Sequence, residues 1–290
     1  MKSVYLKLSP VVVLFLSSII WGLTWLPLKF IHSKGIDGLP LLLVSHAALG
    51  VLMLFAQPSL REFKKNLRPL LGIALAGGGA IICFTYALMY GDVIRVMVLF
   101  YLLPVWGVLG GWLLLGEPAD ALRWIGVVMA LLGAYLILGG SQILIEPPSF
   151  IDLLALLSGM AFAINNLLFR AVERVGLVIK LSAMFWGCAL LAATLLIAGV
   201  QSIPITLGYE PWLWVLLYSV TAMLLANLGS QWSVTQMESG KSSVILIMEL
   251  VAAVVSALLI AGERLEPLEW LGCFLIVAAA LLEARRPIGA

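Results

Sequence analysis

Two stretches of this chain repeat each other and decide how it folds. Residues 102–135 read LLPVWGVLGGWLLLGEPADALRWIGVVMALLGAY, and residues 248–281 read MELVAAVVSALLIAGERLEPLEWLGCFLIVAAAL. A step of 146 residues aligns Gly116-Glu117 with Gly262-Glu263, and it also aligns Trp124 and Gly126 with Trp270 and Gly272. Solenoid repeats recur every ~20–50 residues, so a step of about half the chain predicts two homologous halves instead. We place them at 1–145 and 146–290.

The composition places the chain in a membrane. Of its 290 residues 63% are hydrophobic and only 11% are charged, and the mean hydropathy is +1.12. Soluble domains carry roughly 25% charged residues, and a helix needs ~20 apolar residues to cross the hydrocarbon core. We therefore predict an all-α integral membrane protein with ten transmembrane helices. Their approximate limits are 9–31, 39–57, 69–89, 93–115, 121–141, 149–170, 179–200, 211–234, 241–261 and 266–284.

Several classes of function find no support in the sequence. Cys83, Cys188 and Cys273 are scattered through apolar segments, which favours packing over a disulfide framework. The net charge is +2 and no basic tract carries interleaved aromatics, so no nucleic-acid partner is expected. No cofactor or metal is predicted, and no Gly-x-x-x-x-Gly-Lys-Ser/Thr motif for ATP occurs. The apolar run near the N-terminus has no cleavage site and is interpreted as the first membrane helix.

Lysine and arginine predict the orientation. With the N-terminus inside, the inner segments hold 13 of the 17 basic residues and the outer segments hold 4. This bias places both termini in the cytoplasm. Each half has five spans, so the second half enters the membrane from the opposite side. Inverted repeats are typical of secondary transporters, which bind substrate near the midplane where the repeats meet.

Two spans contain residues that break helices. Gly77, Gly78 and Gly79 lie in the middle of the third span, which we expect to be soft, and Pro104 lies in the fourth. Lipid cannot satisfy freed backbone groups, so such breaks are expected to face protein or a wet cavity.

The order of short motifs, and their duplication, resembles the EamA-type exporters of the drug/metabolite transporter superfamily over nearly the whole chain. The matching residues are Trp21-Gly22, Tyr86-Ala87-Leu88, Pro104, Leu115-Gly116-Glu117, Trp124-Ile125-Gly126, Glu249, Gly262-Glu263 and Trp270-Leu271-Gly272. The resemblance implies two inverted five-helix repeats around a central cavity, lined by spans one, three, four, six, eight and nine, for small metabolites. Two positions depart from the family pattern: His46 stands where arginine is frequent, and Leu250 replaces the proline that often follows Glu249.

Glu249 is the most informative single residue. It lies about eight positions into the ninth span, with no other charge between Lys241 and Ala261. An ionised carboxylate in a bilayer is costly, so it is expected to face a cavity, bind a cation or stay protonated. It is our candidate for coupling transport to protons and for neutralising a substrate ammonium group. A structural carboxyl that bonds to a neighbouring helix is the alternative.

The other candidates are polar or aromatic side chains inside predicted spans. Two sets, beginning at Trp21 and Phe162, recur at i, i+3, i+4 and i+7 and so form helical stripes. Amides can bind substrate or join helices, and aromatics can hold a cation or anchor a helix at the interface. His46 is a second candidate for coupling, with a packing role as its alternative. The predicted substrate-binding residues are Trp21, Thr24, Trp25, Tyr86, Tyr90, Tyr101, Phe162, Asn165, Asn166, Phe169, Asn227, Gln231, Trp232 and Glu249.

The leading hypothesis is a secondary active transporter of the cytoplasmic membrane that exports a small organic metabolite. An amino acid, or a similar amphiphilic zwitterion or cation, fits an apolar cavity with amides and one acid. The alternatives are an uptake carrier for an organic cation, a channel, and a lipid-modifying enzyme, although no carboxylate, His or Cys cluster supports an enzyme. The expected partners are the substrate and the lipid bilayer, in a monomer or a weak homodimer.

Overall fold

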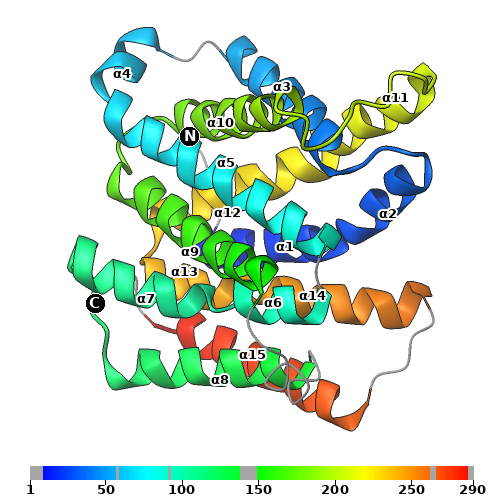
Figure 1. Cartoon of the computed structure of the whole chain (residues 1–290). Helices are drawn as coiled ribbons and strands as arrows, with labels where there is room; N and C mark the ends of the chain where they lie inside the picture. The colour runs from blue at the N-terminus through cyan, green and yellow to red at the C-terminus, as the bar shows by residue number, and fades with distance from the viewer. Residues whose placement is uncertain (1–8, 57–58, 91–92, 138–148, 262–265, 287–290) are drawn as a thin grey trace, which may run out of the picture.

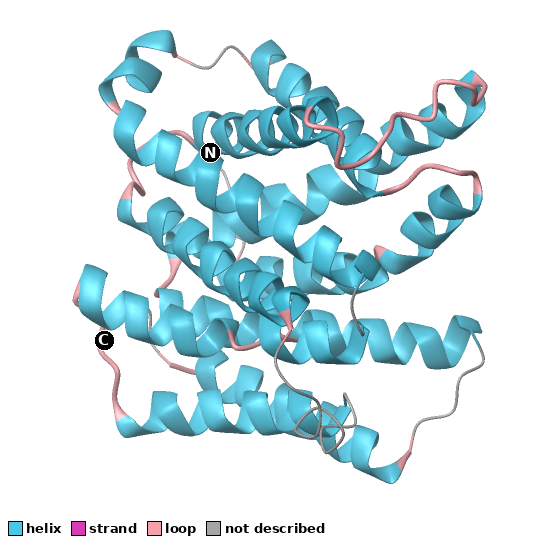
Figure 2. Ribbon diagram, viewed as in Figure 1, coloured by secondary structure: helices cyan, strands magenta, loops and turns pink. Residues whose placement is uncertain are grey.

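The computed structural model describes residues 9–56, 59–90, 93–137, 149–261 and 266–286, and every regular element within them is a helix (Figures 1 and 2). The first half contains α1 (Pro10–Leu23), α2 (Trp25–Ser33), α3 (Gly38–Phe55), α4 (Leu60–Lys65), α5 (Leu67–Tyr90), α6 (Val93–Phe100), α7 (Leu103–Leu115) and α8 (Ala121–Ile137). The second half contains α9 (Phe150–Ala171), α10 (Leu177–Ile197), α11 (Tyr209–Tyr218), η2 (Ser219–Met223), α12 (Leu224–Gln236), α13 (Ser239–Leu246), α14 (Met248–Ser256), η3 (Ala257–Ala261) and α15 (Pro267–Ala284).

The helices have the length and surface of membrane spans. Eight helical stretches in the described part are long and apolar enough to cross a bilayer, and two shorter apolar helices, α7 and α8, accompany them. Large apolar side chains such as Phe55, Leu114 and Ile197 lie on the outside of the bundle, where a soluble protein would place charges. The chain is therefore a multi-pass integral membrane protein, as its composition predicted.

The contacts between helices are consistent with two inverted repeats. The second span of each half pairs with its counterpart (α3 with α10), and so does the fifth (α8 with α15). The other contacts occur as matched sets: α5 packs on α9 as α12 packs on α1, and α7 packs on α9 as α14 packs on α1. Exchanging the halves thus reproduces the contact pattern. The predicted boundary between residues 145 and 146 lies outside the described residues, and so does the Gly262-Glu263 break.

Three spans are interrupted near their middle. The first span breaks at Thr24, the fourth at Tyr101 and Leu102, and the ninth at Ile247. Tyr101 and Ile247 are one repeat step apart, so the fourth and ninth spans break at equivalent positions. Pro104 stands in the first turn of α7, as expected of a residue that lacks a backbone donor. The ninth span breaks without a proline, and Glu249 therefore sits in a broken helix even though Leu250 replaces that proline.

The expectation of a soft third span was wrong, because α5 runs unbroken from Leu67 to Tyr90. Gly77 and Gly78 instead allow close packing. A methyl group on Gly77 would lie 2.6 Å from Met184 Cγ, and one on Gly78 would lie 2.7 Å from the backbone nitrogen of Cys188. Both partners belong to α10, so the missing side chains let α5 and α10 approach each other closely.

The bundle has two distinct ends (Figure 1). One carries the turn between α7 and α8, the turn after α9 and the end of α15. We name it the charged end, comprising residues 116–123, 170–176, 235–241 and 283–286. The other carries the loop between α2 and α3 and the segment before α11. We name it the open end, comprising residues 32–38 and 199–209.

Candidate functional site

A cavity of about 300 Å³ lies between the two halves and reaches the surface at the open end. Its mouth is formed by the loop between α2 and α3, where His32 and Asp37 pair at 2.8 Å with side chains that are 72% and 54% exposed. From there it extends inward between α1, α3, α5, α9 and α12 to Glu249. Its volume is at the lower end of the range for pockets that hold small molecules.

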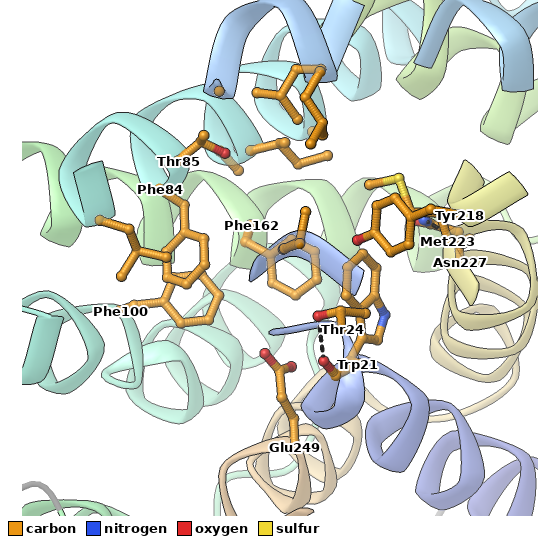
Figure 3. A pocket seen from close by; sticks show the side chains of 18 of the residues that line it. Trp21, Thr24, Phe84, Thr85, Phe100, Phe162, Tyr218, Met223, Asn227 and Glu249 are labelled. Carbon is orange, nitrogen blue, oxygen red and sulfur yellow. Dashed lines mark hydrogen bonds between the residues drawn. The ribbon is translucent and has the colours of Figure 1, made fainter. Parts of the chain in front are cut away.

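Glu249 extends into this cavity from the first turn of α14, directly after the break at Ile247 (Figure 3). The backbone of α14 lies directly against α1 at this level. The two helices are so close that a methyl group on Gly22 would collide with the carbonyl oxygen of Glu249. Tyr101, itself buried, is hydrogen-bonded to the Glu249 carboxyl through its hydroxyl. The break in the fourth span and the break in the ninth therefore meet at one carboxyl group.

Aromatic rings form one wall of the cavity. The centroids of Phe84 and Phe100 are 4.5 Å apart, and those of Phe100 and Phe162 are 6.0 Å apart. Trp21 and Tyr218 lie across the cavity from the Phe84 and Phe100 rings (Figure 3). The edges and faces of such rings suit a flat or apolar body, and their faces attract cations.

The polar groups of the cavity are few. Thr24 donates its hydroxyl to the Trp21 carbonyl oxygen at 2.6 Å, which satisfies an acceptor at the break in the first span, and its side chain also bonds with Tyr218. Asn227 donates from Nδ2 to the Met223 carbonyl oxygen at 2.9 Å. Within the described part of the chain, no lysine or arginine lines the cavity. A bound solute would therefore meet acceptors, hydroxyls and aromatic faces.

Five of the predicted substrate-binding residues line the cavity together. They are Trp21, Thr24, Phe162, Asn227 and Glu249. They come from both halves, and they lie at the level where two of the spans break. Tyr101 is placed just behind them by its contact with Glu249.

Four predicted aromatic residues lie outside the cavity. Trp25 donates from Nε1 to Ser256 Oγ at 2.9 Å, whereas Leu28 of the same stripe lines the cavity. Tyr86 and Tyr90 stack on each other with centroids 4.5 Å apart, and Tyr90 is exposed. Trp232 is partly buried on α12 and does not line the cavity.

The remaining candidates lie on the same helices but closer to the charged end. Gln231 donates from Nε2 to Asn166 Oδ1 at 3.2 Å, and Asn165 Nδ2 lies 3.5 Å from the same oxygen. All three amides are buried, and they join α9 to α12. Phe169 lies further along α9, with the Lys180 ammonium 5.1 Å from its ring centroid. The stripe that began at Phe162 thus enters the cavity only at its first residue.

His46 lies in the helical core, away from the cavity. It is fully buried, and its Nδ1 is 3.0 Å from both the Leu42 carbonyl oxygen and Ser45 Oγ. Its ring packs edge-on against Phe185, with centroids 6.0 Å apart. These contacts favour the packing role for His46.

The charged end is closed by paired side chains. Gly116 ends α7 with φ +67°, a left-handed conformation that suits glycine, and so turns Glu117 back toward the bundle. Burial raises the pKa of Glu117, while the Ser239 backbone N–H and Arg170 act in the opposite direction. Hydrogen bonds from Arg286 lower the pKa of Asp120 to about 2. None of the described residues of this end lines the cavity, which reaches the surface at the open end.

Several cavity residues were not predicted from the sequence. Phe84, Thr85, Tyr218 and Met223 all line it. The repeat step pairs Phe84 with a serine and Tyr218 with a glycine, so duplication carried no signal for them. Phe100 is different: one repeat step separates it from Leu246, and both line the cavity beside the equivalent breaks. That pairing was a usable signal.

The fold and the sequence were also compared with those of known proteins. A solved crystal structure of a protein matches with a TM-score of 0.77 and 18% identity, covering 96% of this chain and 99% of that one. At this identity it shows the fold alone. Comparison with curated proteins found no match. The profile of the EamA-like transporter family matches residues 8–139 and again residues 149–284. The two matches cover nearly the whole sequence, and the chain therefore belongs to the EamA-like transporter family, a family of membrane transporters and not of enzymes.

Proposed function

We propose that this transporter exports a small amphiphilic amine, either an amino acid or a related organic cation, by alternating access between its two repeats. The observation that carries the proposal is the position of Glu249, a carboxyl group that extends into a cavity lined mainly by apolar and aromatic side chains. The cavity lies between the repeats, which is where inverted-repeat transporters bind their substrates.

The chemistry of the cavity favours an ammonium group on the substrate. An ionised carboxylate with little water around it is costly, and a proton or a cation removes that cost. Beside Glu249, the rings of Phe100 and Phe162 offer apolar surface for the body of the substrate. Trp21 and Tyr218 offer further aromatic faces. One ammonium group on an aromatic or branched apolar body matches this arrangement.

Proton exchange follows from the same carboxyl group. Glu249 is either protonated or paired with the substrate ammonium, so arrival of the substrate releases a proton and its departure allows one to bind. In this mechanism one proton enters for each substrate cation that leaves. His46 takes no part, because its ring nitrogens lie outside the cavity.

The proposed direction rests on the distribution of basic residues. The positive-inside bias puts the charged end in the cytoplasm, so the cavity in this conformation opens to the outside. The structure would then correspond to the state from which an exporter releases its substrate and takes up a proton.

A second candidate is a carrier for an organic cation that lacks a carboxylate. The observation that favours it is the absence of lysine and arginine among the described residues that line the cavity. An amino acid would have to satisfy its carboxylate with the hydroxyls of Thr24 and Thr85 and the amide of Asn227. A decarboxylated amine would need no such partner.

The test is transport by the purified protein in liposomes, with and without an imposed pH gradient. The panel pairs each aromatic and aliphatic amino acid with the amine that differs only by the carboxylate. Flux of either member that is driven by the gradient supports the proposal, and a preference for the amine selects the second candidate. Glu249→Gln should abolish the response to the gradient. Wild-type flux with unchanged pH dependence in that variant would refute the role of Glu249.

A further inference from the structure

The charged end holds a set of ion pairs that join the two repeats. Arg123 in α8 is 1% exposed, and its Nη2 donates to Glu238, which follows α12. Its Nε lies 3.8 Å from Glu283 Oε1 in α15. Both acidic partners belong to the second repeat, and all three side chains are buried.

Two neighbours of Arg123 repeat this arrangement. Glu117 accepts the Ser239 backbone N–H at 2.7 Å, and its Oε1 lies 3.7 Å from Arg170 Nε. Asp120 accepts two hydrogen bonds of 2.8 Å from Arg286, one at each carboxylate oxygen. The three charged side chains of segment 117–123 in the first repeat thus each find their charged partners in the second repeat.

We infer that segment 117–123 is a clamp that holds the charged end shut and sets the resting conformation of the transporter. The inference rests on the proposed function, since it assumes that the repeats move relative to each other. Rocking would carry the whole segment away from the second repeat and would break all three pairings together. Separating a buried arginine from its carboxylate leaves an uncompensated charge, which is far more costly than parting two apolar surfaces.

Where the structure describes it, the counterpart of the clamp in the second repeat carries different charges. One repeat step beyond Arg123 stands Glu269, and one step beyond Asp120 stands Glu266. Glu269 accepts the backbone N–H of Glu266 at 2.6 Å and so caps its own helix, α15. The reversal of charge from Arg123 to Glu269 removes the cation around which the clamp is built. The resting equilibrium should therefore favour the conformation described here.

The experiment measures the distance across each end with pairs of spin labels in the full chain, after replacement of Cys83, Cys188 and Cys273. Labels at Leu122 and Ala171, both exposed, span the charged end, and labels at Ser33 and Ile205, also exposed, span the open end. Arg123→Glu should change the ratio of open to closed conformers at the charged end by at least about tenfold. A second change, Glu238→Arg, restores the pair with reversed polarity and should reverse the effect.

Arg174→Glu is the matched control, because Arg174 is exposed at the same end and makes no ion pair among the described residues. An unchanged charged-end distance in Arg123→Glu, or a change that Glu238→Arg does not reverse, would overturn the clamp. If Arg123→Glu does not fold, the nearly isosteric Glu238→Gln, which removes the charged partner of Arg123, carries the same test with the same opposing outcomes. The readout requires no substrate, so a wrong substrate class would leave it intact, whereas a rigid protein would show one distance in every variant.

Discussion

The two ends of the bundle use charge in opposite ways. In the cavity that reaches the open end, Glu249 extends among aromatic side chains, Asp37 pairs with His32 at the mouth, and no lysine or arginine is among the described lining residues. At the charged end, acidic and basic side chains from both repeats are paired, and Arg123 and Glu238 are buried. A carboxyl group without a charged partner can bind a cationic ligand, whereas the paired charges join the two repeats to each other. The family profile matches both halves, yet equivalent positions such as Arg123 and Glu269 carry opposite charges.

The largest expected effect tests the carboxyl group of Glu249 in the cavity. Glu249→Gln keeps the size of the side chain and removes its charge, so a bound ammonium loses its ionic partner. Loss of one member of a buried charge pair costs about 2–5 kcal/mol, so we expect transport to fall by roughly 100-fold in liposomes. Glu210→Gln is the control, because that carboxylate is 62% exposed and pairs with Lys34 at the surface. An equal loss of transport in both variants would show that Glu249 has no special role among the carboxylates.

The next effect concerns the close contact between α1 and α14, which positions Glu249. Gly22→Ala would drive a methyl group into the Glu249 carbonyl oxygen, and such overpacking costs about 1–3 kcal/mol. We expect a lower melting temperature in detergent. Gly79→Ala is the matched control, since a methyl group there meets nothing within 4 Å and alanine favours the helix. If Gly22→Ala is as stable as Gly79→Ala, then the contact between α1 and α14 can adjust to an added methyl group and does not fix the position of Glu249.

A smaller effect sharpens the description of the aromatic wall. Phe162→Ala removes one ring from the wall that Phe84 and Phe100 complete. Aromatic contacts contribute about 0.5–1.5 kcal/mol beyond buried area, so the KM for an aromatic substrate should rise roughly 3–10-fold. The KM for an aliphatic substrate should rise less. Phe274→Ala, on the exposed surface of α15, should change neither value.

The smallest effect is a pH dependence of the charged end. Burial raises the pKa of Glu117 and outweighs the Ser239 backbone N–H and Arg170, which lower it. A raised pKa means that the closed clamp binds a proton more tightly than a solvated, opened clamp would. Lowering the pH toward the titration range of Glu117 should therefore favour the closed form by a few-fold, in the spin-label distances across the charged end.

Two variants separate the groups of the clamp in that measurement. Glu117→Gln should weaken the pH dependence. Asp120→Asn should leave it unchanged, because the pKa of Asp120 is about 2 and this carboxyl stays ionised throughout. Its own contribution is present above its ordinary pKa and is lost only as the pH falls through about 2. If Asp120→Asn abolished the pH dependence and Glu117→Gln did not, Glu117 would not be the titrating group.

Much of the fold could be predicted from the sequence, because membrane spans and duplications leave strong patterns. Apolar length located the helices, and the Gly116-Glu117 turn appeared as predicted. The break at Ile247 could not be predicted, because no residue there prevents a continuous helix. Conversely, Gly77 and Gly78 looked like breaks, but their lack of side chains serves the contact with α10.

The cavity was predictable only in part. Glu249 stood out because a lone carboxyl in a span is costly, and Trp21 and Phe162 followed from helical periodicity. Periodicity also predicted Trp25, whose indole instead donates to Ser256 Oγ, although Leu28 of the same stripe lines the cavity. It also gives no absolute rotation for a helix, which is why Asn166 and Gln231 were grouped with residues that line the cavity when they instead join α9 to α12.

The unequal chemistry of the two equivalent breaks has one further consequence. In the fourth span, the ring of Pro104 removes a backbone donor for good, so no rearrangement can restore a regular helix through that point. In the ninth span, Ile247 and Leu250 keep their amide hydrogens, and Leu250 already donates one to the Ile247 carbonyl oxygen at 2.9 Å. The covalent structure of Pro104 therefore prevents a regular helix through the fourth span, whereas the backbone of the ninth span can still form one. Of the two, only the segment that bears the acid has the freedom to wind and unwind.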